Sequence, residues 1–229
     1  MKSFTLRVAC VWLMFSSVAL ADSTAQRELA GALRATPNSV HGEALFDNCA
    51  SCHGADGGGE LNGSTPRIAG QHFRALVKQL VDFRAGKRWD FRMEVAAAQH
   101  HLTGAQDIAD VADYISRLYP VGARGIGSGE FVEEGKQLYA RECKSCHGAE
   151  AQGTKDGVPR LAGQHYSYLM RQMYDAVDNR RPPLSRLHGK RLAPFDFEQI
   201  RALSDYLARV DSPARGVLQI HHHAHELRD

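Results

Sequence analysis

The chain has 229 residues, of which 43% are apolar and 24% are charged, and it contains 21 glycines, 5 cysteines and 12 histidines. This composition excludes a disordered tail, a collagen-like fibre and a membrane protein with several spans. The length suits one large domain or two small ones, and the formal net charge is +2.

The first 21 residues have the pattern of an export signal. Lys2 and Arg7 form a basic start, residues 8–20 are almost uninterruptedly apolar, and Ala19-Leu20-Ala21 offers a cleavage site between small residues. The apolar run is short for a bilayer span, although an uncleaved N-terminal anchor is the alternative. We therefore expect residues 1–21 to be a cleaved signal peptide and the protein to be periplasmic. Cleavage removes two of the 28 basic residues and none of the 26 acidic ones, so the remaining chain is formally neutral. A neutral chain gives no support to a nucleic-acid partner.

Four cysteines remain after the signal, and they occur in two identical arrangements. Residues 49–53 and 143–147 both read C-x-x-C-H, the sequence through which haem c is attached. A thioredoxin-like dithiol would need a βαβ pattern that is absent, and a structural zinc site would need a further ligand. The sequence therefore predicts two covalently bound haem c groups, attached through Cys49, Cys52, Cys143 and Cys146 and bound at the iron by His53 and His147.

Helical periodicity follows each motif in the same order. Apolar residues at 42–54 and 136–148 predict a first helix in each half, and the stripes that begin at Phe73 and Tyr166 predict a second. Apolar positions over 108–118 and 197–207 predict a last helix, with Thr103 and Asp196 at the N-cap positions. No alternating strand pattern appears, so we predict an all-α fold.

A duplicated segment shows that the chain is a tandem repeat. Residues 66–72 and 159–165 both read Pro-Arg-x-Ala-Gly-Gln-His and differ only in the third position. Residues 121–129 contain four glycines and no helical stripe, as expected of a linker. We therefore predict two small helical domains, each built around a haem, at residues 22–120 and 130–211, followed by a disordered His-rich tail at 212–229.

These motifs resemble those of the dihaem cytochromes c of the c4 type, which are tandem class I cytochrome c domains. The resemblance covers about residues 39–210 and rests on the haem motifs, the duplicated segment, Gly86-Lys87-Arg88 and residues 107–110. It implies that the carbonyls of Pro66 and Pro159 accept hydrogen bonds from the iron-binding histidines, which would orient each ring and raise its basicity. The alternative is that these prolines only stiffen a loop.

The resemblance also implies that Met93 is the sixth ligand of the first haem. A lone methionine is more often core filler, and His100 and His101 compete for the same position. A softer thioether ligand favours ferrous iron, so this haem would have the higher potential.

The second half departs from the family pattern. Its methionines, Met170 and Met173, fall on a helix and are expected in the core, and the predicted loop at residues 179–194 contains His188 instead of a methionine. We expect His147/His188 ligation, with a surface histidine beside an open iron as the alternative. His165 is a spare candidate, but it repeats as His72 and is better explained by the shared fold.

The resemblance implies an electron carrier that performs no bond chemistry. Its partners would be redox proteins such as a membrane-bound respiratory complex or a terminal oxidase, with peripheral membrane contact compatible with that role. The alternative is a small redox enzyme, peroxidase-like or thiosulfate-oxidising, in which the second haem is catalytic. That reading needs an open iron and acid/base groups, for which only Asp178 and Asp196 lie nearby in sequence, so no catalytic residue is predicted.

Two weaker features remain. Basic residues around His188 could steer an acidic partner or pair with haem propionates, or form a solvated loop: Arg180, Arg181, Arg186, Lys190 and Arg191. The histidines at 221–223 and 225 could bind a transition metal or belong to a solvated tail.

Overall fold

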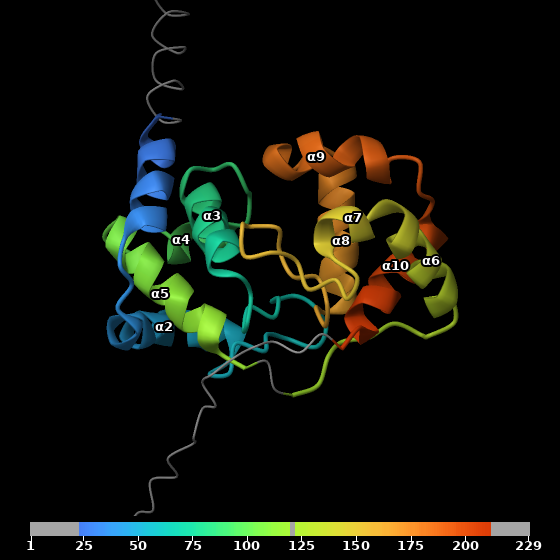
Figure 1. The fold of residues 1–229 in the computed structure, drawn as a ribbon. Helices are drawn as coiled ribbons and strands as arrows, with labels where there is room; N and C mark the ends of the chain where they lie inside the picture. Colours follow the sequence, from blue (N-terminus) through green and yellow to red (C-terminus); the bar gives the residue numbers. More distant parts are fainter. Residues whose placement is uncertain (1–22, 120–121, 212–229) are drawn as a thin grey trace, which may run out of the picture.

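The computed structural model describes residues 23–119 and 122–211. The predicted signal peptide and the His-rich tail therefore lie outside the described residues. The regular elements of the described chain are helices, and they form two groups that lie side by side (Figure 1). None of the helices in these ranges is long and apolar enough to cross a bilayer.

The first group contains a helix over residues 23–34, then α2 (Ser39–His53), α3 (Phe73–Arg84), α4 (Phe91–Ala96) and α5 (Ala105–Arg117). The helices α2 and α5 cross closely because Gly42 lies at the crossing: a Cβ there would be 2.1 Å from the carbonyl oxygen of Asp110. Around this crossing a core of buried side chains forms, with Phe46, Val77 and Ile108 at its centre.

The second group repeats this arrangement with α6 (Val132–Glu142), α7 (Lys144–His147), α8 (Tyr166–Val177), α9 (Pro182–Leu192) and α10 (Phe197–Arg209). Here α6 crosses α10 at Gly135, where a Cβ would be 2.0 Å from the carbonyl oxygen of Ala202. The core of this group includes Leu138, Leu169 and Leu203. The all-α prediction and the tandem arrangement are thus confirmed.

The predicted helices are present, but two details differ. Asp196 caps α10 in a capping box with Gln199, as its position predicts. The prediction for Thr103 is wrong: Gly104 is the N-cap of α5, and the Thr103 hydroxyl donates to the Asp107 carboxylate at 2.8 Å instead of accepting from the helix. A second difference is that the first helix of the second group is interrupted at Cys143, between α6 and α7.

The segment that we expected to be a loop, residues 179–194, contains the helix α9. Its first two positions are prolines, which a first helical turn accepts because the missing N–H groups have no partner inside a helix. The sequence hides this helix because it lacks a clear apolar stripe. His188 therefore lies on a regular element rather than on a flexible connection.

The helix over residues 23–34 was not predicted either. It packs on the first core through Ala25 and Ala32, which are 6% and 0% exposed. Arg84 joins it to the rest of the domain, because its guanidinium pairs with Glu28 and also donates to the carbonyl oxygens of Ala97 and Leu102 at 2.7 and 2.6 Å. This extra helix therefore braces the segment between α4 and α5.

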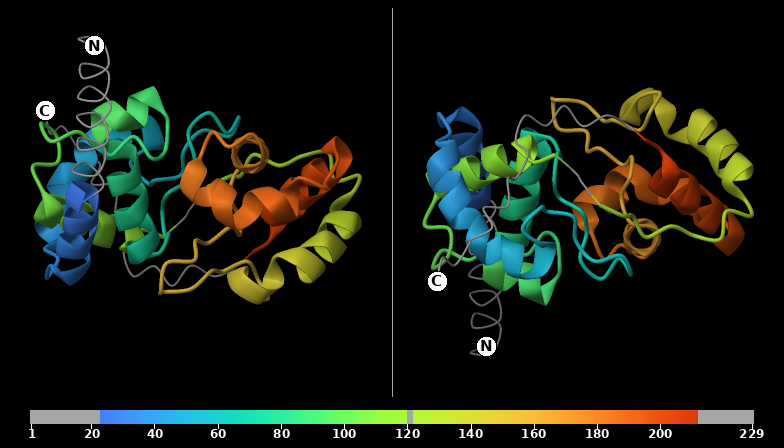
Figure 2. Two further views of the ribbon diagram at one scale, coloured as in Figure 1. Left: turned by 90° about the horizontal axis from the view of Figure 1, so that it is seen from above. Right: turned by 90° about the horizontal axis from the view of Figure 1, so that it is seen from below.

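The duplicated segments meet each other where the two groups of helices adjoin (Figure 2). The amide of Gln164 donates to the Arg67 carbonyl at 2.7 Å and accepts from the Arg67 N–H at 3.0 Å. The amide of Gln71 does the same with Arg160, at 3.0 and 2.8 Å. The repeat noticed in the sequence is thus a reciprocal contact between the domains.

Residues 122–129 run between the domains without forming a helix, and hydrogen bonds fix them along their length. Asp205 accepts from the N–H groups of Gly127 and Gly129 at 2.9 and 2.6 Å. The N–H of Gly125 donates to Nδ1 of His165 at 3.0 Å. These bonds tie the connection to the second domain, so it does not act as a free tether.

Candidate haem-binding sites

The histidines of the two C-x-x-C-H motifs are buried and oriented in the same way. His53 ends α2, His147 ends α7, and they are 5% and 7% exposed. Their Nδ1 atoms lie 2.9 and 3.0 Å from the carbonyl oxygens of Pro66 and Pro159. Each ring therefore donates through Nδ1 and keeps the lone pair of Nε2 available for a metal. The hydrogen bonds implied by the family resemblance are present.

The protonation state of both histidines suits metal binding. Burial lowers the pKa of His53 and of His147, although the proline carbonyls partly oppose this effect. An iron ligand must be the neutral imidazole, so no proton has to be displaced at neutral pH. A haem iron thus fits the donor atoms that these histidines present.

The paired cysteines are free thiols of two kinds. Cys49 and Cys143 are half-buried, whereas Cys52 and Cys146 are exposed. Burial raises the pKa of Cys49 and of Cys143 to about 11. A redox-active dithiol instead depends on a thiol with a lowered pKa. The thiols therefore fit covalent attachment of a haem beside the histidine better than disulfide exchange.

A second imidazole faces the histidine of the second motif. The rings of His147 and His188 have centroids 6.0 Å apart and planes inclined by 49°. Two imidazoles on opposite sides of one metal ion, each with a bond of about 2 Å, have centroids about 6 Å apart. Burial lowers the pKa of His188, and the nearby Arg181 and Arg191 add to this effect. Its Nδ1 is buried without a hydrogen-bond partner among the described residues.

The helix α9 holds His188 in this position. It packs along α8, and Gly189 lies at the contact, where a Cβ would be 3.0 Å from the Ala176 carbonyl oxygen. Arg191, one turn of helix away from His188, donates to the carbonyl oxygen of Glu142 at 2.6 Å and so joins α9 to the end of α6. His188 is thus held by contacts of α9 with α8 and with the end of α6, the helix that precedes α7 and its His147.

In the first domain, Met93 lies in the short helix α4. Asp90 caps this helix by accepting from the N–H groups of Arg92 and Met93 at 3.1 and 3.3 Å. The charges of Arg92 and Asp90 influence the pKa of His53, so the first turn of α4 lies near that ring. Met93 itself is half-buried.

The other candidate ligands lie in different surroundings. His100 and His101 follow α4, and their rings contact each other at 4.2 Å. His165 is 0% exposed and uses both nitrogens, because Nδ1 accepts from Gly125 and Nε2 lies 2.8 Å from the Gly58 carbonyl oxygen. Met173 packs in the second core, as expected. We therefore assign His165 to the fold, in agreement with its repetition as His72.

Among the basic residues around α9, only Arg181 turns deeply inward. It shares two glutamines with Arg88: both guanidinium groups donate to Gln79 at 2.6 Å and to Gln172. Burial, followed by the charge of Arg88, lowers the pKa of Arg181 to about 10. Two half-buried cations with uncharged hydrogen-bond partners suit the carboxylates of a haem. The sequence signal for this cluster is that Gln79 and Gln172 occupy equivalent positions in α3 and α8.

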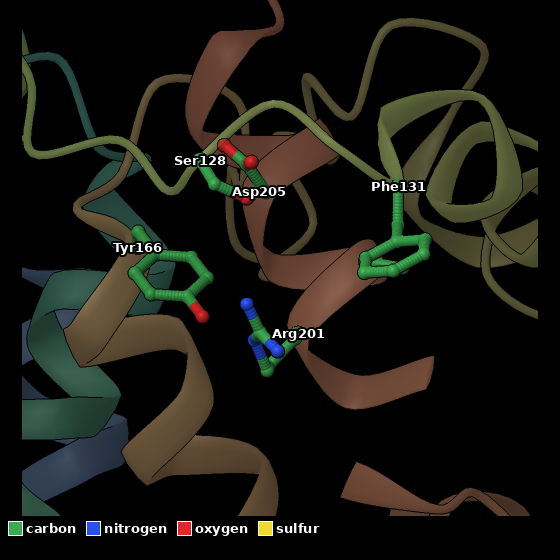
Figure 3. Close-up of a pocket in the computed structure, with 6 residues that line it drawn as sticks. Ser128, Phe131, Tyr166, Arg201 and Asp205 are labelled. Atoms are coloured by element: carbon green, nitrogen blue, oxygen red, sulfur yellow. The ribbon is translucent and has the colours of Figure 1, made fainter. Parts of the chain in front are cut away.

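The two carboxylates on which the enzyme alternative would draw both form other contacts. Asp178 forms an ion pair with Arg180 at 2.7 Å, and Asp196 caps α10. A small surface hollow beside α10 is lined by Ser128, Phe131, Tyr166, Arg201, Ala202 and Asp205 (Figure 3). The carboxylate of Asp205 in this hollow already holds residues 127–129, so the hollow belongs to the connection between the domains.

Comparison with known proteins agrees with this geometry. The sequence profile of the family Cytochrome c matches residues 39–118 and 132–211. A cytochrome c4 of Pseudomonas aeruginosa is 32% identical in an alignment of 188 residues that covers 78% of this chain and 92% of that protein. A thiosulfate dehydrogenase electron acceptor of Thiomonas intermedia is 33% identical in an alignment of 172 residues that covers 70% of this chain and 77% of that protein.

A solved structure, that of reduced recombinant cytochrome c4 from Pseudomonas stutzeri, aligns with a TM-score of 0.67 and 27% identity, and covers 77% of this chain and 100% of that one. Two cytochrome c domains, each with a paired-cysteine motif, imply two haem c groups. The chain therefore belongs to the cytochrome c family, as a dihaem cytochrome of the c4 type.

Proposed function

We propose that this protein carries electrons in the periplasm, between redox proteins, on two haem c groups with different axial ligands. Cys49 and Cys52 would attach the first haem, with His53 and Met93 as its ligands, and Cys143 and Cys146 would attach the second, with His147 and His188. The proposal includes a cleaved signal at residues 1–21, domains at 22–120 and 130–211 and a linker at 121–129. When bound, each haem iron would exchange one electron with a partner.

The observation that carries the proposal is the facing pair of His147 and His188. Ligation by both histidines would leave no open position for a substrate at the second iron, and Asp178 and Asp196 form other contacts. The protein side chains would then serve to bind and orient the cofactor, with Pro66 and Pro159 fixing the rings of the iron-binding histidines. These are the requirements of a carrier rather than of an oxidoreductase that transforms a substrate.

The relatives suggest the class of partner. Proteins similar to this chain include thiosulfate dehydrogenase electron acceptors and a subunit of a cbb3-type cytochrome c oxidase from Azorhizobium caulinodans. The oxidase subunit is 29% identical in an alignment of 179 residues that covers 72% of this chain and 56% of that subunit. We propose that this chain accepts electrons from a periplasmic dehydrogenase and passes them toward a respiratory oxidase.

Low-temperature EPR of the ferric, haem-loaded protein tests the ligands. We expect two low-spin signals, one typical of His/Met and one typical of bis-His coordination, because Met93 and His188 differ as donors. Two His/Met signals would remove His188 from the site. A large high-spin signal would indicate an open iron and would replace the carrier by the enzyme alternative.

A further inference from the structure

The two iron-binding histidines are each connected to the opposite domain through a single peptide group. The carbonyl of the Pro66–Arg67 peptide accepts from His53 at 2.9 Å, and the N–H of the same peptide donates to Gln164 of the second domain at 3.0 Å. The Pro159–Arg160 peptide is bonded in the same way, to His147 at 3.0 Å and to Gln71 of the first domain at 2.8 Å. Two equivalent chains of hydrogen bonds therefore cross the interface.

A second peptide group also links each iron-binding histidine to the opposite domain. The Gly58 carbonyl oxygen lies 2.8 Å from Nε2 of His165, and the N–H of that peptide, from Gly59, donates to the His53 carbonyl at 2.8 Å. In the other domain, Nε2 of His72 lies 2.7 Å from the Gln152 carbonyl oxygen, and Gly153 donates to the His147 carbonyl at 2.8 Å. The Gln-His pair that ends each duplicated segment thus holds both the side chain and the backbone of the iron-binding histidine in the other domain.

We propose that Gln164 is a positioning residue for His53, and Gln71 for His147, so that each domain tunes the haem of its partner. Consecutive hydrogen bonds polarise one another. When Gln164 accepts from the Arg67 N–H, the Pro66 carbonyl becomes a stronger acceptor and His53 a more basic ligand. A more basic ligand favours ferric iron, so each glutamine lowers the potential of the haem in the opposite domain.

This inference rests on the proposed function, because it requires haems bound by His53 and His147. The test uses the full-length, haem-loaded protein with Gln164→Met or Gln71→Met, substitutions that keep the volume of the side chain but remove its amide. Reductive titration gives the two couples, and NMR of the haem methyl groups assigns each couple to a domain. Each variant serves as the matched control of the other.

We expect Gln164→Met to raise the potential of the first haem and to leave the second nearly unchanged. Gln71→Met should do the reverse. The reduction equilibrium constant of the affected haem should change by twofold to tenfold, where tenfold corresponds to about 59 mV for one electron. The crossed pattern, in which each substitution shifts only the haem of the opposite domain, is one that general damage to the interface would not produce.

The inference is overturned if a variant shifts both couples equally, shifts only the haem of its own domain, or shifts neither. If Gln164→Met does not fold, the sign of the shift in Gln71→Met and the domain in which it occurs decide. A separate count of haems by the absorption of their pyridine complexes, together with the low-spin EPR signals, checks the proposed function. A protein that passes this check and lacks the crossed shifts contradicts only the role of the glutamines.

Discussion

At the scale of single residues, hydrogen bonds distinguish the histidines that can present a nitrogen to iron from those that belong to the fold. His53 and His147 donate through Nδ1 to a proline carbonyl and so present Nε2, whereas His165 has both nitrogens engaged. The sequence distinguishes the first two because each follows a C-x-x-C motif. It cannot distinguish His165 from His188 by local pattern, because the partners of both lie far away along the chain.

One buried carboxylate is predicted to control the stability of the first domain. Asp110 is 1% exposed and accepts from the Asn38 N–H at 2.7 Å, from Gln106 at 2.7 Å and from His41 at 2.8 Å. Burial alone would raise the pKa of Asp110, but these hydrogen bonds outweigh burial and leave the pKa below its ordinary value. Asp110→Ala should cost about 2–3 kcal/mol at neutral pH, because the Asn38 N–H loses its acceptor.

The pH dependence of this cost follows from the direction of the pKa shift. Because the pKa of Asp110 is lower in the folded state, its contribution is complete above the unfolded value of about 4 and is lost as the pH falls below it. Guanidinium unfolding at neutral pH and near pH 3 should therefore show that the difference in the free energy of unfolding between wild type and Asp110→Ala is smaller in acid. Asp47→Ala, on the exposed side of α2, is the control. A difference in the free energy of unfolding that does not change with pH would contradict the stabilising role of the ionised Asp110 carboxylate.

At the scale of elements, close crossings of paired helices set the shape of each domain. Gly42 allows α2 to contact α5, and Gly135 allows α6 to contact α10, at equivalent positions of the repeat. The long amphipathic helices follow from local periodicity and were predicted. The helix α9 was not, because its stability comes from packing on α8 and from Arg191, rather than from a continuous apolar stripe.

The crossing of α6 and α10 gives an element-scale prediction. In Gly135→Ala the new Cβ would lie 2.0 Å from the Ala202 carbonyl oxygen and 2.9 Å from Cβ of Tyr206, so the helices must separate. We expect a loss of about 2–3 kcal/mol in the free energy of unfolding. Gln137→Ala, at an exposed position of the same helix, should change it by less than about 0.5 kcal/mol. Thermal unfolding of both haem-loaded variants measures the change in stability. Equal stability of Gly135→Ala and Gln137→Ala would show that α6 shifts at little cost in free energy.

At the scale of the whole molecule, the two domains form one hydrogen-bonded unit with pseudo-symmetric contacts and unequal sites. The duplicated segments exchange equivalent bonds through Gln71 and Gln164, and Arg181 reaches Gln79 of the first domain. The proposed distal ligands would break this symmetry, with Met93 on α4 in one half and His188 on α9 in the other. Under the proposed ligation, two different redox centres would share one hydrogen-bonded interface.

Different axial ligands at the two irons predict two separate redox couples. The first haem should take up electrons at the higher potential, because a thioether favours ferrous iron and a second imidazole favours ferric iron. His188→Met should raise the second couple and bring the two closer together. Spectroelectrochemical titration, with the haems assigned by NMR, measures both. Two indistinguishable couples in the wild-type protein would contradict unequal ligation.

The sequence by itself determined the cofactor, the duplication and the long helices. Each of these depends on residues that are close together in the chain: a cysteine pair beside a histidine, a repeated segment, or apolar positions three and four residues apart. Only the tertiary structure decided what the repeated Gln-His pairs do, which histidine faces His147, and that Arg88 and Arg181 share two glutamines. These contacts join residues that are distant in sequence, and the packing of two domains, rather than any local pattern, brings them together.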